Sequence, residues 1–291
     1  MTLAPVFVDL ALAVCAMVTC AVLLIVGPGR LVAAVRDYRW RIRAIVAPIA
    51  VLVLILFLRG ATKDLVPILS WRIVGIRVTQ HIFDLERVIF GENPVAILQS
   101  FQTPELTSYF VFTYIYGYAF LLLFPFVAYF ALDRMDELRA LLLAYTTNYG
   151  VGLVLYVLLV AYGPRNFDPT LFDAVLYDAY PQARNLTNSV NQNVNVFPSL
   201  HTSLAMTTLC FAWHTREKYP LWLPVAAVLA ISVVVSTMYL GIHWLSDAVA
   251  GTVLALCSTY VGVNYTVEEI AASVRTFVRS RLENGLSPRR E

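Results

Sequence analysis

Apolar runs about as long as a lipid bilayer is thick recur along this chain, and they constrain its fold more than any other feature. A helix needs about 20 apolar residues to cross the hydrocarbon core, and only helices or closed barrels satisfy their backbone hydrogen bonds there. Charged residues make up 14% of the 291 residues and hydrophobic residues 59%, whereas soluble proteins average about 25% charged residues. We therefore expect an all-α, polytopic membrane helical bundle.

Seven of these runs are predicted to span the membrane. The section between the second and third runs contains amphipathic stretches such as HIFDLERVIFG, which predict helices lying on the membrane surface. The spans are expected at residues 6–26, 44–58, 109–132, 141–162, 197–213, 221–242 and 247–263. The chain then divides into an extra N-terminal helix with a basic loop (1–43), a six-helix membrane domain (44–265) with interfacial helices at 60–108, and a charged tail (266–291).

The distribution of basic residues predicts which side of the membrane each loop faces. Cytoplasmic loops are enriched in Lys and Arg, and seven spans place the two ends of the chain on opposite sides. With the basic segment 30–43 inside, 14 of the 21 Lys and Arg residues fall on the inner side. We therefore expect a cell-membrane protein with its N-terminus outside and its C-terminus in the cytoplasm. His201, His243 and the polar connection 163–195 then lie at the outer face.

The segment STMYLGIHWLSDAVAG contains an ionisable pair between two apolar runs. His243 precedes Asp247 by four residues, a spacing that places both on one face if the segment is helical. A carboxylate in that position fixes the imidazole tautomer and leaves the other ring nitrogen free to attack. Ionisable groups at membrane depth are costly and tend to be functional. The structural alternative is a buried pair that only closes the turn.

The segment NVFPSLHTSLAM is predicted to begin another helix. Pro198 suits a helix start, and Ser199 and Thr202 suit the first turn. The unpaired N–H groups at such a terminus favour an anion, so His201 would lie beside a bound phosphate and could act as a general acid. The structural alternative is a helix cap with a histidine at the membrane interface.

Arg165, in the segment AYGPRNFDP, is the third candidate of the site. Its planar, permanently charged guanidinium suits bidentate phosphate binding, although an arginine there could also anchor the chain at the interface. Other basic residues predicted on the same face are further candidate phosphate ligands, namely Lys63, Arg72, Arg77, Arg87 and Arg184.

The two histidine segments resemble signature motifs of the type 2 phosphatidic acid phosphatase superfamily. PSLHT is similar to its second motif, PSGH, and S-T-x5-H-x3-D to its third, SR-x5-H-x3-D. Within the superfamily, the leucine of PSLHT and the run TMYLGIHWLSD resemble the inositol phosphorylceramide synthase branch and its prokaryotic relatives. The resemblance implies a six-helix core, here preceded by one extra N-terminal span. It also implies that His243 is the nucleophile, Asp247 its partner and His201 the acid for the leaving group.

Three departures from the superfamily's pattern point towards its transferase branch. Thr237 stands where the phosphatases have a phosphate-binding arginine, and Leu200 replaces the glycine of PSGH. The first motif, K-x6-RP, is missing, and Arg165 in GPR is the candidate substitute. We therefore assign phosphate binding to Arg165, Ser199 and Thr237.

These observations predict an integral membrane lipid phosphotransferase that works through a phosphohistidine intermediate at the outer membrane face. Its partners would be a phospholipid donor and a lipid or water acceptor, with no nucleic acid. No acidic cluster with metal-binding spacing occurs at this face, so we expect neither a metal nor another cofactor. One alternative is a lipid phosphate phosphatase that uses water as acceptor. Another is a haem-binding redox protein with His201 and His243 as axial ligands, which would leave Asp247 without a role.

Overall fold

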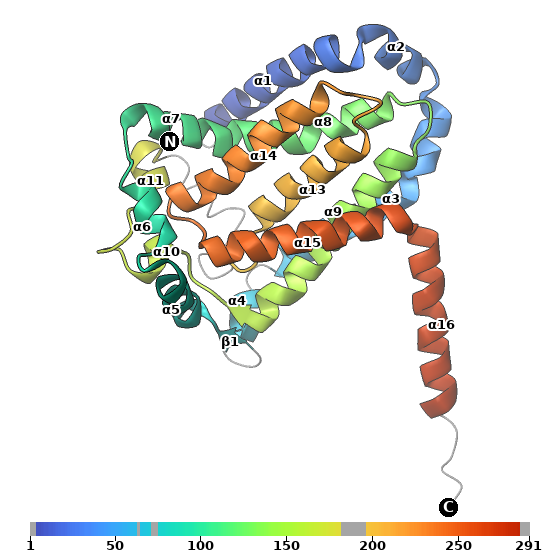
Figure 1. Cartoon of the computed structure of the whole chain (residues 1–291). Coiled ribbons are helices and arrows are strands. Elements are labelled where there is room, and N and C mark those ends of the chain that lie inside the picture. Colours follow the sequence, from blue (N-terminus) through green and yellow to red (C-terminus); the bar gives the residue numbers. More distant parts are fainter. Residues whose placement is uncertain (1–3, 63–64, 71–74, 182–195, 286–291) are drawn as a thin grey trace, which may run out of the picture.

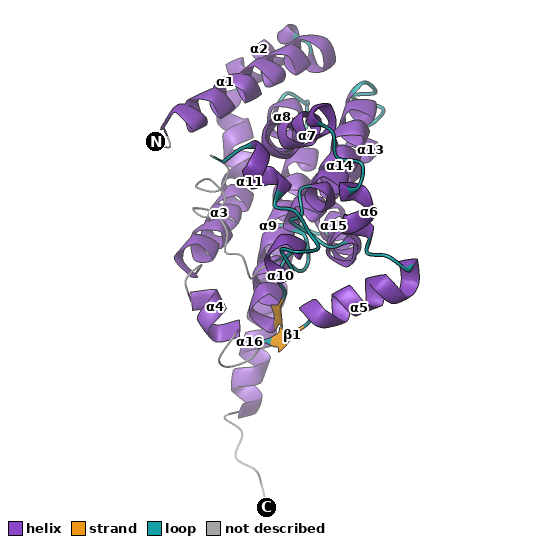
Figure 2. Ribbon diagram, turned by 90° about the vertical axis from the view of Figure 1, so that its left-hand side faces the viewer, coloured by secondary structure: helices purple, strands orange, loops and turns teal. Residues whose placement is uncertain are grey.

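The computed structural model describes residues 4–62, 65–70, 75–181 and 196–285, and nearly all of them are helical (Figures 1 and 2). Within this described part, strand occurs only where β1 (Ile76–Arg77) pairs in parallel with β2 (Leu159–Val160). The expected all-α membrane bundle is therefore confirmed.

Six helical segments are long and apolar enough to cross a membrane, which makes this a multi-pass membrane protein. The first is Phe7–Val26, in α1 (Ala4–Ala21) and the π-helical turn η1 (Val22–Val26), and the second is α3 (Tyr38–Thr62). The third is Pro104–Phe130, formed by α7 (Pro104–Phe112), η3 (Thr113–Gly117) and α8 (Tyr118–Phe130). The others are α9 (Asp136–Leu158), α14 (Trp222–Tyr239) and α15 (Leu245–Asn264).

The predicted fifth span is the helix α13 (Leu200–His214), which is shorter than these six segments. Its 15 residues correspond to about 22 Å of helix. It lies in the centre of the bundle, in contact with α8, α9, α14 and α15. Short polar contacts join it to α9: Asn148 Nδ2 donates to Thr207 Oγ1 at 3.0 Å, and the hydroxyls of Tyr145 and Thr208 are 2.7 Å apart. Such hydrogen bonds hold helices together where lipid removes the hydrophobic driving force between them.

The basic segment 30–43 is helical, whereas the sequence predicted a loop. Residues Pro28–Arg36 form α2, and α3 already begins at Tyr38 and contains Pro48 within it. One reason is that Arg41 is buried: its Nη1 donates to the carbonyl oxygen of Phe130 at 2.8 Å and also to that of Leu132. These carbonyls lie at the C-terminal end of α8, where backbone acceptors lack partners within the helix.

The short surface helices gather at one end of the bundle, which we call the site end. Figure 1 shows α5, α6, α10 and α11 there, whereas α2 and α16 lie at the opposite end. The chain also begins at the site end, because Leu10 of α1 packs against the cluster that contains Tyr114 and Leu240. The remaining helices outside the spans are α4 (Leu65–Leu69), α5 (Thr79–Phe90), α6 (Pro94–Gln99), α10 (Pro164–Phe167), α11 (Val175–Ala179) and α16 (Val267–Gly285).

Candidate active site

The turn between α14 and α15 holds His243 against Asp247. His243 comes directly before Trp244, the N-cap of α15, and Asp247 is the third residue of the helix. The Asp247 Oδ2 atom accepts a hydrogen bond from the Trp244 amide at 2.9 Å and lies 3.3 Å from His243 Nδ1. The contact predicted from helical spacing is present, but its cause is different: the carboxylate caps its own helix and meets the ring there.

Burial keeps the imidazole of His243 in its neutral form. The side chain is 2% exposed, and this burial, together with the nearby Arg165 charge, lowers the pKa of His243 to about 3. With the Nδ1 proton donated to Asp247, the lone pair of the neutral ring is on Nε2. His243 is therefore set up as a nucleophile or a base at neutral pH.

The start of α13 brings His201 to the same place. Ser199 is the N-cap of this helix, and its Oγ accepts a hydrogen bond from the Thr202 amide at 3.2 Å. The ring centroids of His201 and His243 are 5.8 Å apart. The His201 ring also lies between Tyr114 and Tyr118, each with its ring centroid 4.9 Å away.

Two backbone contacts fix this arrangement of α13 and α15. The amide of Ser199 donates to the carbonyl oxygen of Asp247 at 3.1 Å. A Cβ atom on Gly251 would collide with the Ser199 carbonyl oxygen, so only glycine permits this approach. The sequence suggested that the amides at this helix start are free to bind an anion, but the Ser199 amide is already paired. The amides of Leu200 and His201 have no acceptor among the described residues and are the free donors at this terminus.

Arg165 approaches the His243 turn from α10. Its amide donates to the carbonyl oxygen of Gly241 at 3.2 Å, and the preceding Gly163 lies so close to the Ile242 carbonyl that a Cβ would collide with it. Arg165 is 7% exposed, and its guanidinium donates from Nη2 to the Tyr177 hydroxyl at 2.8 Å. Its Nε and Nη1 atoms are buried and have no partner among the described residues. Unpaired buried donors of this kind are costly, and a bound anion would satisfy them.

Thr237 supports the turn through its backbone. Its carbonyl oxygen accepts from the amides of Ile242 and His243 at 2.9 and 3.0 Å. Its hydroxyl donates to the Val234 carbonyl oxygen at 2.7 Å. The single hydroxyl proton is thus used within α14, and a direct phosphate contact would require it to turn away from Val234.

Sequence reasoning missed Glu86, a buried carboxylate that reaches α15 from α5. Its Oε1 accepts from the Ser246 amide at 2.7 Å and its Oε2 from Asn93 Nδ2 at 3.1 Å. The buried face of this amphipathic helix is Thr79, Ile82 and Glu86, whereas its apolar residues Leu85 and Ile89 are exposed. The signal was an acid four residues after Ile82 in a chain that carries few charges.

The site end also contains Arg59, in the last turn of α3, which sequence reasoning did not select. Its guanidinium carbon lies 5.6 Å from the ring centroid of Tyr149 and 5.4 Å from that of Tyr156. Of the other basic candidates, Arg87 lies over Phe83 at 5.5 Å, and Arg77 is exposed on β1. Lys63, Arg72 and Arg184 lie outside the described residues, as do residues 182–195 of the polar connection.

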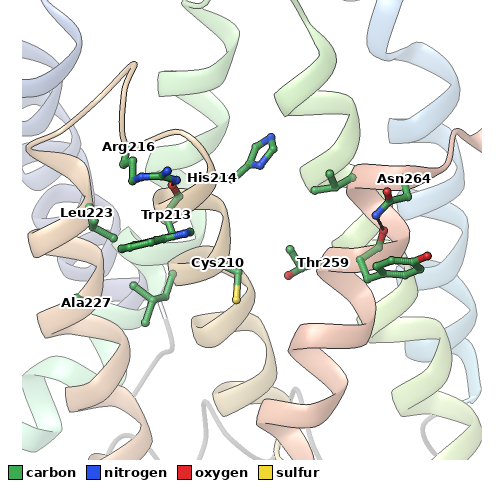
Figure 3. A pocket seen from close by; sticks show the side chains of 11 residues that line it. Cys210, Trp213, His214, Arg216, Leu223, Ala227, Thr259 and Asn264 are labelled. Carbon is green, nitrogen blue, oxygen red and sulfur yellow. Dashed lines mark hydrogen bonds between the residues drawn. The ribbon is translucent and has the colours of Figure 1, made fainter.

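Cavities occur at both ends of the bundle. One of about 530 Å³ lies between α5 and α15 at the site end, lined by apolar residues that include Phe197 and Leu245. Another of about 750 Å³ lies among α13, α14 and α15 at the opposite end, where Figure 3 shows Trp213, His214 and Arg216 around it. In the described part of the chain, no group of three or more His, Cys, Asp or Glu side chains could hold a metal ion.

The sequence matches the PAP2 superfamily over residues 80–261. The chain belongs to this superfamily. The match extends from α5 to α15 and includes both histidines, Asp247 and Arg165. Neither the curated proteins nor the solved structures gave a significant match. The PAP2 superfamily generally comprises phosphatases and phosphotransferases that act on lipids, which supports a function of this general type for this multi-pass membrane protein.

Proposed function

We propose that this PAP2 protein is a lipid phosphotransferase in which His243 is the nucleophile. The observation that carries the proposal is the pairing of two histidines with different surroundings: Asp247 contacts Nδ1 of His243, and the His201 ring lies 5.8 Å away. An oriented, neutral imidazole beside a second proton carrier is the arrangement that covalent transfer needs. The largely apolar cavity between α5 and α15 is lined by Phe197 and Leu245, which are close in sequence to His201 and His243, and it supports a substrate with acyl chains.

In the first half-reaction, Nε2 of His243 attacks the phosphorus of a phosphodiester lipid in line with the leaving oxygen. A P–N bond forms as the P–O bond to the lipid alcohol breaks, and His201, which takes up a proton when the anionic phosphate binds beside it, donates that proton to the departing oxygen. Asp247 stabilises the positive charge that develops on the imidazole. Arg165, with its two unpartnered nitrogens, and the free amides of Leu200 and His201 hold the phosphoryl oxygens.

In the second half-reaction, an acceptor alcohol attacks the phosphohistidine. His201 now takes the proton of that alcohol, the P–N bond breaks, and His243 returns to its neutral form. A lipid alcohol as acceptor gives transfer of the head group, whereas water gives hydrolysis. We favour transfer because Thr237 replaces an arginine, so the site carries less positive charge and suits the single charge of a diester. The resemblance of TMYLGIHWLSD to inositol phosphorylceramide synthases agrees with this choice.

The test is a product analysis with labelled phosphodiester lipids, with and without a lipid alcohol. We expect the label to move to the added alcohol, and kcat/KM to be higher for diesters than for phosphatidic acid. A protein that strongly prefers phosphatidic acid and releases free phosphate is a lipid phosphatase, and the transferase proposal is then wrong.

We further propose that the site end faces outwards and the C-terminus lies in the cytoplasm. The charge distribution supports this orientation, and α16 follows α15 at the end remote from the site. In a cysteine-free background, a cysteine at Glu92 in the turn after α5 should react with impermeant thiol reagents added to intact cells. A cysteine at Glu217, at the opposite end, should not. Both positions are exposed, and the reverse labelling pattern would place the site on the cytoplasmic side.

A further inference from the structure

Arg59 is a cation near the end of the candidate membrane span Tyr38–Thr62, just beyond the predicted span 44–58, and it lies against two tyrosines. It lies in the last turn of α3, and its guanidinium lies near the rings of Tyr149 and Tyr156 of α9 at 5.6 and 5.4 Å. Aromatic faces attract a guanidinium, but they supply no negative charge that neutralises it. A cation at membrane depth is costly and calls for a functional explanation.

The charge of Arg59 has no counterion in the described part of the chain. None of the ion pairs there includes Arg59, and its Nη1 atom is buried without a hydrogen-bond partner. A buried, unpaired guanidinium nitrogen loses its hydration and gains nothing in return. The expected partner is therefore an anion that arrives with the substrate.

The position of Arg59 places such an anion on the His201 side of the site. The hydroxyl of Tyr156 donates to the carbonyl oxygen of Pro198 at 3.4 Å, which joins the tyrosine pair to the start of α13. Arg59 therefore approaches the start of α13 through Tyr156, whereas Arg165 approaches the His243 turn through the Gly241 carbonyl oxygen. The two arginines thus approach the histidine pair from two sides.

We propose that Arg59 is the second phosphate-binding cation of this site and that it shares the phosphoryl oxygens with Arg165. This inference rests on the proposed function and extends it to a residue outside the segment that matches the superfamily. The ligand class is a phosphoryl anion, either the phosphodiester of a lipid or free phosphate. Arg59 reaches the site from a different helix than Thr237, and with it the site holds two cations, whereas the superfamily motifs K-x6-RP and SR supply three, so the site still carries less positive charge.

The experiment measures ligand binding in protein that cannot turn over. Purified His243→Ala protein in detergent is heated with increasing inorganic phosphate, and separately with a short-chain phosphodiester lipid, and the rise in Tm gives the affinity. Adding Arg59→Gln should weaken binding at least about tenfold, because a hydrogen bond to a charged group is lost. Arg59→Lys keeps the charge but loses the fork geometry, so it should bind with intermediate affinity.

Arg43→Gln is the matched control, since Arg43 is an exposed arginine at the other end of the same helix. It should bind both ligands as the parent does. Loss of binding in Arg59→Gln for the lipid alone assigns the site to a diester, and loss for phosphate as well assigns it to any phosphoryl group. A lower Tm with unchanged affinity for both ligands would mean that Arg59 only holds the tyrosines, and the inference is then overturned.

The binding and activity measurements distinguish a failure of this inference from a failure of the proposed function. If the wild-type protein converts no lipid but phosphate binding still depends on Arg59, the proposed function fails and the second cation stands. If the wild type transfers head groups and Arg59→Gln leaves KM and binding unchanged, the function stands and Arg59 is not a ligand.

Discussion

Charged side chains have different partners at the two ends of the bundle, and α3 shows this difference within one helix. Near its start, Arg41 donates to the carbonyl oxygens of Phe130 and Leu132. Near its end, Arg59 faces tyrosine rings, and its Nη1 has no partner among the described residues. The same contrast recurs elsewhere: Lys218 forms an ion pair with Glu137 at the opposite end, while Arg165 donates only to a neutral phenol.

We interpret the paired charges as stabilising the fold and the unpaired charges as available to bind a ligand. At the end remote from the site, the buried Arg41 meets two backbone acceptors at Nη1, which compensate much of its desolvation, although its Nε has no partner among the described residues. At the site end, buried donors are left without such acceptors. Substitutions at the two ends should therefore change different measured quantities.

The largest difference in turnover is expected between substitutions of a histidine at the site end and of one at the opposite end. His243→Ala should reduce turnover to background, because it removes the atom that forms the covalent intermediate. His214→Ala, an exposed histidine at the opposite end, should keep wild-type turnover. The measurement is head-group transfer by purified protein, with Tm recorded for both variants. More than a few per cent of activity in folded His243→Ala protein would rule out the covalent mechanism.

A loss of about 10²-fold in kcat is expected for His201→Ala, since a positioned general acid typically contributes 10² to 10⁴. The loss should be smallest for an activated substrate whose leaving group needs no proton. Comparing a natural lipid with such an analogue separates the two cases. Equal losses on both substrates would contradict the acid role.

Glu86→Ala should lower kcat about tenfold with little change in KM, which corresponds to about 1.4 kcal/mol of lost transition-state stabilisation. The reason is that Glu86 holds the Ser246 amide, next to the residue that orients His243. Glu86→Gln keeps an acceptor oxygen and should restore most of the rate. Asp84→Ala, on the exposed face of the same helix, is the control. A change in Tm alone, without the change in kcat, would show that Glu86 only stabilises the fold.

The smallest effect on catalysis is expected at the opposite end. Lys218→Gln removes the ion pair with the largely buried Glu137, and partly exposed pairs contribute about 1 kcal/mol or less. We expect Tm to fall by a few degrees while kcat and KM stay at wild-type values. A clear loss of kcat in folded protein would show that the two ends are coupled.

The membrane fold was predictable because long apolar runs leave few alternatives in lipid. The start of α3 was not: the positive charge of Arg39, Arg41 and Arg43 indicated a loop, but the carbonyls at the end of α8 bind Arg41 and draw the segment into a helix. Those acceptors come from residues far away in the sequence, so local composition could not reveal them.

Local sequence signals identified the residues of the candidate site better than they identified their contacts. A helix start near Pro198 followed from local sequence, and the structure places the N-cap at Ser199, one residue later. The bond between the Ser199 amide and the Asp247 carbonyl depends on how α13 packs against α15 at Gly251. The same holds for Arg59 and Glu86, which reach the site from helices far away in the chain.

The shortness of α13 determines how substrate and enzyme meet. At about 22 Å, this 15-residue helix is shorter than the hydrocarbon layer of about 30 Å. If its far end lies at one boundary, the end that carries His201 lies several ångströms below the other boundary. Under the proposed function, a lipid would then bring its phosphate to the histidines by diffusing sideways within its own leaflet. The relevant concentration is the mole fraction of substrate in the membrane, so diluting it with inert lipid should slow the enzyme even when the amount per volume is constant.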